Sequence, residues 1–409
     1  MRWADDIDPL GGFFGGALLG LASTVMMYGY GKITGMSGIV SSSVIFTPHD
    51  DKRWAWSFVA GAIVGGIIFI NAHPSSFDSE STATTGALIV AGIITGVGTR
   101  VGAGCTSGHG ICGLSRLSPR SLVAVGTFMF VAVITAIICQ GTDLKDLVVR
   151  KNPVSNSVLG EPALLLAPSV SVAVVIMALF SYNFWLYPML GRPYKEGATA
   201  VIPAQVWVMT FCCGVVSGLA LALSNMCDPQ KVIQFLNFPG DEGWDPTLAF
   251  VMAGGVMVNI VSFYFLAQKD HPPLLAPEGS AKLSSIIKYK LHDDNLKIDY
   301  KLIGGSVLFG IGWGMVGVCP GPALVNLGAY RRDSAVLMPS MLAGFAIFEV
   351  TWGSSLLSYT TWFPNSVDPN QPRCNDCEIG PCEDHNLVSG TPSHAASKRS
   401  ISLADDNNK

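Results

Sequence analysis

Apolar stretches of close to 20 residues alternate with short polar segments along this 409-residue chain. A helix needs about 20 apolar residues to cross the hydrocarbon core of a membrane. The pattern predicts nine membrane helices, at residues 10–31, 54–72, 85–104, 120–139, 163–187, 203–225, 246–267, 302–318 and 334–358. Glycine interrupts several of these stretches, which predicts short re-entrant helices among them, since broken helices are tolerated where protein covers the freed backbone.

Composition supports the same fold class, because 49% of the residues are hydrophobic and only 13% are charged. The 45 glycines fit membrane helices that pack closely on small residues. We therefore expect an all-α polytopic protein surrounded by lipid. A net charge of −4 gives no indication of nucleic-acid binding. The acidic start MRWADDIDPL lacks the basic region of a signal peptide, so the first helix is expected to be retained.

Lysine and arginine gather in the loops of one predicted face, and such an excess marks the cytoplasmic side. With nine spans, this places the N-terminus outside and the C-terminus in the cytoplasm, and we expect the plasma membrane. Residues 268–300 are predicted to form a basic cytoplasmic loop. Residues 365–409 are polar and are predicted to be a disordered tail.

Two halves of the chain resemble each other, since GALLGLA at 16–22 matches GVVSGLA at 214–220. We assign 1–195 to a first membrane repeat and 196–364 to a second. The first span then corresponds to the sixth, and this odd offset predicts that the halves are inverted. Inverted repeats are a common plan of secondary transporters, whose site lies between the repeats.

Each half contains a cysteine held in glycine. The first is Cys105 in GVGTRVGAGCTSGHGICG, and the second is Cys319 in GIGWGMVGVCPGPALVNLG. In both copies one glycine stands nine residues before the cysteine and another stands seven before it. A buried cysteine is most often a small packing residue. The repeated spacing favours a site over that interpretation.

Several polar or small residues accompany the two cysteines. Exposed backbone N–H groups and hydroxyls at a helix start can bind an anion, and we include these residues in a predicted pathway: Gly104, Thr106, Ser107, Gly108, His109 and Gly321. Lys32 and Cys227 lie at the ends of apolar stretches. They are either mouths of the pathway or interfacial loops.

Arg100 lies inside an apolar stretch, five residues before Cys105. An arginine at membrane depth is costly unless it faces a cavity or a partner. It either attracts an anion or pairs with Glu349 to fix the fold, and one side chain could do both.

The tail contains a cluster of soft ligands, Cys374, Cys377, Cys382 and His385. These residue types suit zinc or sulfur exchange, although the cluster could equally have no specific role. Neither a phosphate-binding loop nor a strand-led GxGxxG motif is present. An ATP-driven pump is therefore not expected. We also expect neither an enzyme nor a bound cofactor.

The chain resembles the YeeE/YedE family of sulfur-transport membrane proteins over roughly residues 12–355. The resemblance rests on GTRVGAGCTSGHGICGLSRLSPRSLVAVGTFM, MCDPQKVIQFLNFPGDEGWDPTLAFVMAGG and FGIGWGMVGVCPGPALVNLG. It implies thiosulfate uptake through an hourglass-shaped fold, with Cys105 and Cys319 contacting the anion through S–H···S contacts. Family members can carry a further cysteine in the first repeat, whereas GKITGMSGIV has none.

The sequence thus predicts a permease for thiosulfate or a related sulfur anion. The alternative is a membrane thiol protein that hands sulfane sulfur to a soluble cytoplasmic partner. A third interpretation is a structural subunit of a larger transporter.

Overall fold

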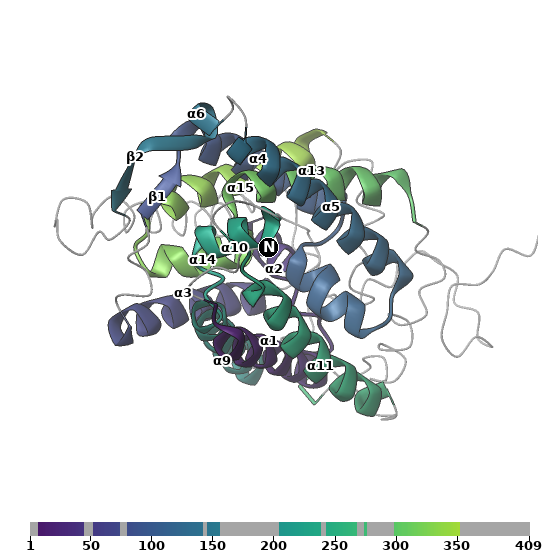
Figure 1. Ribbon diagram of the computed structural model, residues 1–409. Coiled ribbons are helices and arrows are strands. Elements are labelled where there is room, and N and C mark those ends of the chain that lie inside the picture. The colour runs from purple at the N-terminus through teal and green to yellow at the C-terminus, as the bar shows by residue number, and fades with distance from the viewer. Residues whose placement is uncertain are drawn as a thin grey trace, which may run out of the picture. The chain divides into compact units, whose positions relative to one another are not determined.

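The computed structural model describes residues 7–44, 52–73, 80–141, 145–155, 204–238, 243–267, 274–275 and 298–351 (Figure 1). All of them belong to one compact unit, Met1–Ser366. The predicted span at 163–187, nearly all of the 268–300 loop and the 365–409 tail lie outside the described residues.

Helices occupy the other eight predicted stretches. The long ones are α1 (Pro9–Tyr30), α3 (Arg53–Ala72), α4 (Thr85–Val101), α5 (Pro119–Gly141), α9 (Ala204–Leu223), α11 (Thr247–Ala267), α13 (Tyr300–Val316) and α15 (Arg332–Thr351). Four short helices were not delimited by the hydrophobic pattern: α2 (Met36–Val44), the π-helix η2 (Thr106–Gly113), α10 (Pro229–Leu236) and α14 (Pro320–Gly328). A small antiparallel pair, β1 (Glu80–Ala83) and β2 (Val149–Ser155), follows α3 and the four-residue α6 (Lys145–Val148), respectively.

The helices confirm a polytopic all-α membrane fold. Five of them, α1, α3, α5, α9 and α11, are long and apolar enough to cross a membrane. Two bent pairs qualify only together: α4 with η2 at 43°, and α13 with α14 at 40°. The described residues therefore hold five to seven candidate spans, and the number nine stays a prediction.

Local sequence explains where several helices begin. Asp8 precedes Pro9, and its carboxylate accepts a hydrogen bond of 2.8 Å from the amide of Gly11. Asp228 precedes Pro229 in the same way and caps α10. Aspartate accepts from the unpaired N–H groups of a first turn, and proline supplies the φ angle that a first turn requires.

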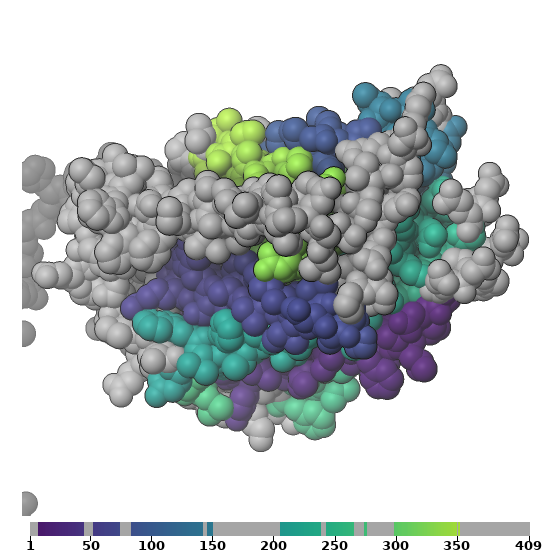
Figure 2. Space-filling model, turned by 90° about the vertical axis from the view of Figure 1, so that its left-hand side faces the viewer, coloured from purple at the N-terminus to yellow at the C-terminus, as the bar shows by residue number. Residues whose placement is uncertain are grey.

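The long helices form two groups of four. In one group α1 packs against α11 and α3 against α9; in the other, α4 packs against α15 and α5 against α13. Figure 2 shows α3 lying along α9 on one face of the molecule. Each of the four short helices contacts members of both groups, and Figure 1 shows α2, α10 and α14 between them.

The repeated glycines lie where helices approach most closely. A β-carbon on Gly98 would lie 2.4 Å from the Phe309 amide nitrogen, and one on Gly312 would lie 2.7 Å from the Ala91 carbonyl oxygen, so both glycines let α4 and α13 touch. Gly96 faces α15 and Gly310 faces α5 in the same manner. The spacing thus packs each bent pair against two neighbours.

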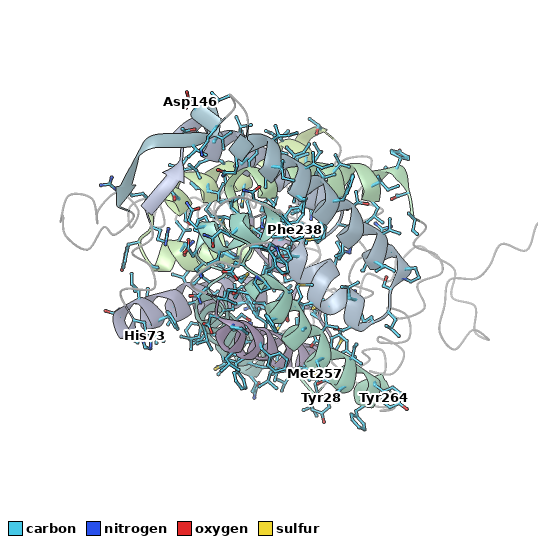
Figure 3. The ribbon with its side chains drawn as sticks, in the orientation of Figure 1. Tyr28, His73, Asp146, Phe238, Met257 and Tyr264 are labelled. Carbon is cyan, nitrogen blue, oxygen red and sulfur yellow. The ribbon has the colours of Figure 1, made fainter. Side chains whose placement is uncertain are left out.

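Outward-facing side chains are apolar, as a lipid environment requires. Met257 and Tyr264 of α11 are 50% and 64% exposed and lie at the outer edge of the molecule in Figure 3. Large apolar side chains on the outside of a helix bundle are stable only in contact with lipid or another protein.

Candidate functional site

Cys105 and Cys319 occupy equivalent places in the two bent pairs. Each is the residue that precedes a short helix, η2 after Cys105 and α14 after Cys319. Both have an extended backbone, which breaks the path of the preceding long helix. Cys105 is buried and Cys319 is half-buried.

A threonine hydroxyl links the two cysteine segments. Thr106 follows Cys105 directly, and its Oγ1 lies 3.6 Å from the Sγ of Cys319. Cys105 and Cys319 thus belong to two segments that meet at this contact. The two halves of the chain therefore bring both sulfur atoms and a hydroxyl to one place.

The start of α2 reaches the same place. The amide of Met36 donates to the Ser107 hydroxyl at 3.0 Å, and the amide of Ser37 donates to the Cys105 sulfur at 3.5 Å. The Ser107 oxygen lies 3.3 Å from that sulfur. Because Ser107 already accepts from Met36, its O–H can donate to Cys105, which leaves the S–H of Cys105 available as a donor.

Hydrogen bonds at equivalent positions hold the two short helices η2 and α14. The Cys112 thiol of η2 donates to the carbonyl of Thr34 at 3.8 Å, and the Asn326 amide of α14 donates to the carbonyl of Cys227 at 2.8 Å. Cys112 and Asn326 each stand seven residues after the cysteine of their half. Thr34 stands two residues before α2, and Cys227 stands two residues before α10. Both halves therefore form this hydrogen bond between equivalent positions.

Six of the seven positive-φ residues in the described part of the chain also pair between the halves, Gly243 being the exception. Residues with positive φ match as Gly31 with Asn225, Ala103 with Gly317, and Leu117 with Tyr330. Gly31 follows α1 and Asn225 follows α9. Ala103 follows α4 and Gly317 follows α13, and Leu117 and Tyr330 follow η2 and α14, respectively. The two halves therefore share turn geometry as well as helix order.

His109 braces η2. Its Nε2 lies 3.0 Å from the Gly102 carbonyl and must donate there, because a carbonyl only accepts. Nδ1 of the neutral ring then accepts from the Ser121 hydroxyl at 3.1 Å. A β-carbon on Gly104 would lie 2.5 Å from this ring. The structure thus places His109 and Gly104 against each other, with the imidazole tied to the end of α4 and to α5.

Arg100 forms an ion pair with Glu349 through Nη2. Its Nη1 donates to the Ser41 hydroxyl at 3.3 Å, and its guanidinium lies 5.4 Å from the centre of the Phe348 ring. The pair that the sequence offered as one interpretation is therefore formed, and it ties α4, α15 and α2 together.

Lys32 is buried between α1 and α2. Its Nζ lies 4.5 Å from the Trp54 ring centre and 5.1 Å from the Tyr30 ring centre. Aromatic faces stabilise a cation at such distances. Lys32 thus lies against the aromatic rings of Trp54 and Tyr30.

The sequence did not identify Met36 and Asn326 as parts of this region. Their positions relative to the helix starts were the only signal, and the short helices were not delimited in advance. Among the described residues, no group of three or more His, Cys, Asp or Glu side chains could hold a metal ion. The tail residues Cys374, Cys377, Cys382 and His385 lie outside the described residues.

Parts of this chain are similar to known proteins. Residues 205–355 match a family of proteins of unknown function (DUF6691). A probable transporter of Xylella fastidiosa (strain 9a5c) is 42% identical over 124 residues, covering 30% of this chain and 88% of that protein. A second one from strain Temecula1 / ATCC 700964 is 30% identical over 137 residues, covering 33% of this chain and 83% of that protein.

The chain belongs to the same family as these proteins. These relatives are much shorter than this chain. The matches cover 88% and 83% of two of them but only 30% and 33% of this chain.

Proposed function

We propose that this protein is a membrane transporter that takes up thiosulfate or a related sulfur anion along a path between its two halves. Membership of a family whose curated relatives are named probable transporters supports transport. The observation that carries the path is the contact between Thr106, which follows Cys105, and Cys319, since it joins the two bent helix pairs.

The chemistry of these groups suits a soft anion that must pass. A thiol is a weak, polarizable donor, so it can contact the outer sulfur of thiosulfate without holding it as firmly as a fixed charge would. Transport requires binding that is favourable enough to admit the substrate and weak enough to release it. The hydroxyls of Thr106 and Ser107 and the amides at the start of α2 add neutral donors around the thiols.

The charged residues have supporting roles in this proposal. Arg100 already pairs with Glu349, so it shapes the path by bracing α4 and α2 rather than by binding the anion alone. Lys32 contributes a buried positive charge at the end of α1, which favours the approach of anions. Gly108 and Gly321 keep the path free of β-carbons.

Uptake by proteoliposomes tests the proposal. Purified protein should accumulate labelled thiosulfate, and Cys105→Ala and Cys319→Ala should each abolish this accumulation. Cys139→Ala is the matched control, because Cys139 is also a buried free thiol but lies on α5 near its C-terminal end. Wild-type uptake in both site variants would overturn the thiol path. Persulfide formation on the protein without uptake would favour the sulfur-carrier alternative instead.

A further inference from the structure

A methionine contacts both cysteine loops. Met36 is the first residue of α2, and it is buried. Its amide is bonded to Ser107 in the Cys105 segment. Its side chain lies against Gly321 in the Cys319 segment, where a β-carbon on Gly321 would be 3.1 Å from the Met36 Cγ. Met36 therefore contacts both halves of the proposed path at once.

The geometry points to Met36 as a specificity-determining residue. We propose that its thioether closes the space between the Cys105 and Cys319 loops and admits only a narrow, soft anion. This inference rests on the proposed function, because it assigns selectivity to the same path.

The backbone at this position is fixed, so only the side chain can yield. The Met36 amide is held by Ser107, and the Ile39 amide donates to the Gly35 carbonyl at 2.9 Å. Gly35 itself lies against Gly108, since a β-carbon on Gly35 would be 3.5 Å from the Gly108 Cα. The first turn of α2 is thus clamped to η2, and opening must come from rotation of the Met36 side chain.

Methionine is suited to such a role. It is unbranched, with three rotatable bonds, and its sulfur makes favourable contacts with polarizable groups. A β-branched or aromatic side chain would be stiffer. A charged side chain would hold an anion or repel it. A thioether can move aside and then replace the contact that it loses with a contact to the passing sulfur.

The second half has no flexible side chain at the position equivalent to Met36. Its matching short helix, α10, begins at Pro229, whose ring cannot rotate away. The Pro229 carbonyl packs on the turn after α13, 2.5 Å from where a β-carbon on Gly317 would lie. The first residue of α2 therefore has a flexible side chain and the first residue of α10 does not, which makes these two equivalent positions asymmetric.

A reversible cross-link tests whether the Met36 side chain must move. A β-carbon on Gly321 would lie 3.5 Å from the Met36 Cβ, within the 3.5–4.5 Å range of natural disulfides. In the double variant Met36→Cys/Gly321→Cys, oxidation should form this bond, and tryptic mass spectrometry should identify the linked peptides. Uptake of labelled thiosulfate should be lost on oxidation and return after reduction and washing. Each single variant and the wild type receive the same treatment as controls, and their uptake should not change between the two states.

Size selection is tested by competition with a bulkier soft anion, an aryl thiosulfonate. Met36→Ala should be inhibited at lower thiosulfonate concentration than the wild type, while Met36→Leu, which keeps the volume, should behave like the wild type. Met338→Leu is the matched control, since Met338 is equally buried but lies on α15. Uptake that continues through the cross-linked protein, or equal inhibition of Met36→Ala and wild type, would overturn the inference.

The two proposals can fail separately. If the wild-type protein takes up no thiosulfate, the proposed function fails. In that case the rate at which a negatively charged methanethiosulfonate modifies Cys319, followed residue by residue, still reports whether Met36 closes the path. The cross-link should slow this modification. An unchanged rate of modification would reject the role of Met36.

Discussion

The ion pair of Arg100 and Glu349 shows how a costly charge is accommodated among apolar helices. Both side chains are 20% exposed, and Arg100 also donates to Ser41. Removing one member of a buried pair leaves the other charge without compensation, which costs more than removing both. Arg100 is therefore first a residue that holds three helices together, and its influence on an anion is indirect.

Substitutions at this pair separate the two roles. We expect Arg100→Gln and Glu349→Gln each to lower stability by roughly 2–3 kcal/mol, because the pair is only partly buried. The double variant Arg100→Gln/Glu349→Gln should recover much of that loss and keep most of the uptake. Thermal unfolding in detergent and proteoliposome uptake measure the two quantities. A double variant that is stable but inactive would show that the Arg100 charge acts on the substrate directly.

Residue chemistry could be predicted from sequence only where a residue was out of place in its surroundings. Arg100 and Glu349 stood out because they are charges in apolar stretches, and their pairing followed. The role of His109 did not, because its partner Ser121 lies across a turn on α5 and looks like an ordinary small polar residue. Met36 gave no signal at all, since a methionine in an apolar segment is unremarkable in sequence.

At the scale of elements, the glycine spacing ahead of each cysteine has a packing cause. Nine residues before each cysteine, Gly96 faces α15 and Gly310 faces α5. Seven residues before each cysteine, Gly98 and Gly312 let α4 and α13 pack on each other. The sequence predicted that the spacing marked a site. The structure shows that these glycines first bring helices together, and that the cysteines stand where the packed helices end.

Substituting one of these glycines should disturb helix packing. A β-carbon at Gly96 would lie 2.3 Å from the Met341 carbonyl oxygen, so Gly96→Ala must push α4 from α15. Overpacking of this kind costs roughly 1–3 kcal/mol. Gly126→Ala on α5 is the control, because nothing lies within 4 Å of its β-carbon, and it should leave stability unchanged or slightly higher. Equal melting temperatures for the two variants would contradict this account of the spacing.

The bounds of the long helices were predictable and those of the short ones were not, for a physical reason. A stretch of 20 apolar residues has few alternatives in a membrane. The 8- and 9-residue helices α2, η2, α10 and α14 are stabilised by neighbours far away in the chain, such as the tie from Asn326 to Cys227. Hydrophobic pattern therefore located the bends at the cysteines but not the helices that surround them.

At the scale of the whole molecule, matching helices of the two halves run antiparallel. Gly15 of α1 faces Ser224, just past the end of α9, whereas Gly29 faces Met209 near its start. Gly98 of α4 and Gly102, just past its end, likewise face Phe309 and Gly305 of α13 in reverse order. Antiparallel partners with shared turns and ties are what an inverted repeat would produce, so we propose that the halves cross the membrane in opposite directions.

Site-directed labelling decides this topology. With the N-terminus outside, α1 begins on the outer face and α9 on the inner face. An impermeant maleimide should therefore label Leu10→Cys from outside in intact cells, and Gln205→Cys only after permeabilisation. Leu10 is 70% exposed and Gln205 is also exposed, so reagent access is comparable. Wild-type protein reports labelling of the native cysteines, and a large change in uptake would exclude a variant from the comparison.

Labelling of both positions from one face would reject the inversion, and with it a path that places Cys105 and Cys319 on opposite sides of a pseudo-two-fold axis. Labelling of opposite faces in the reverse sense would keep the inversion and overturn only the predicted orientation, because the antiparallel packing of α1 and α9 does not depend on which face is the cytoplasm.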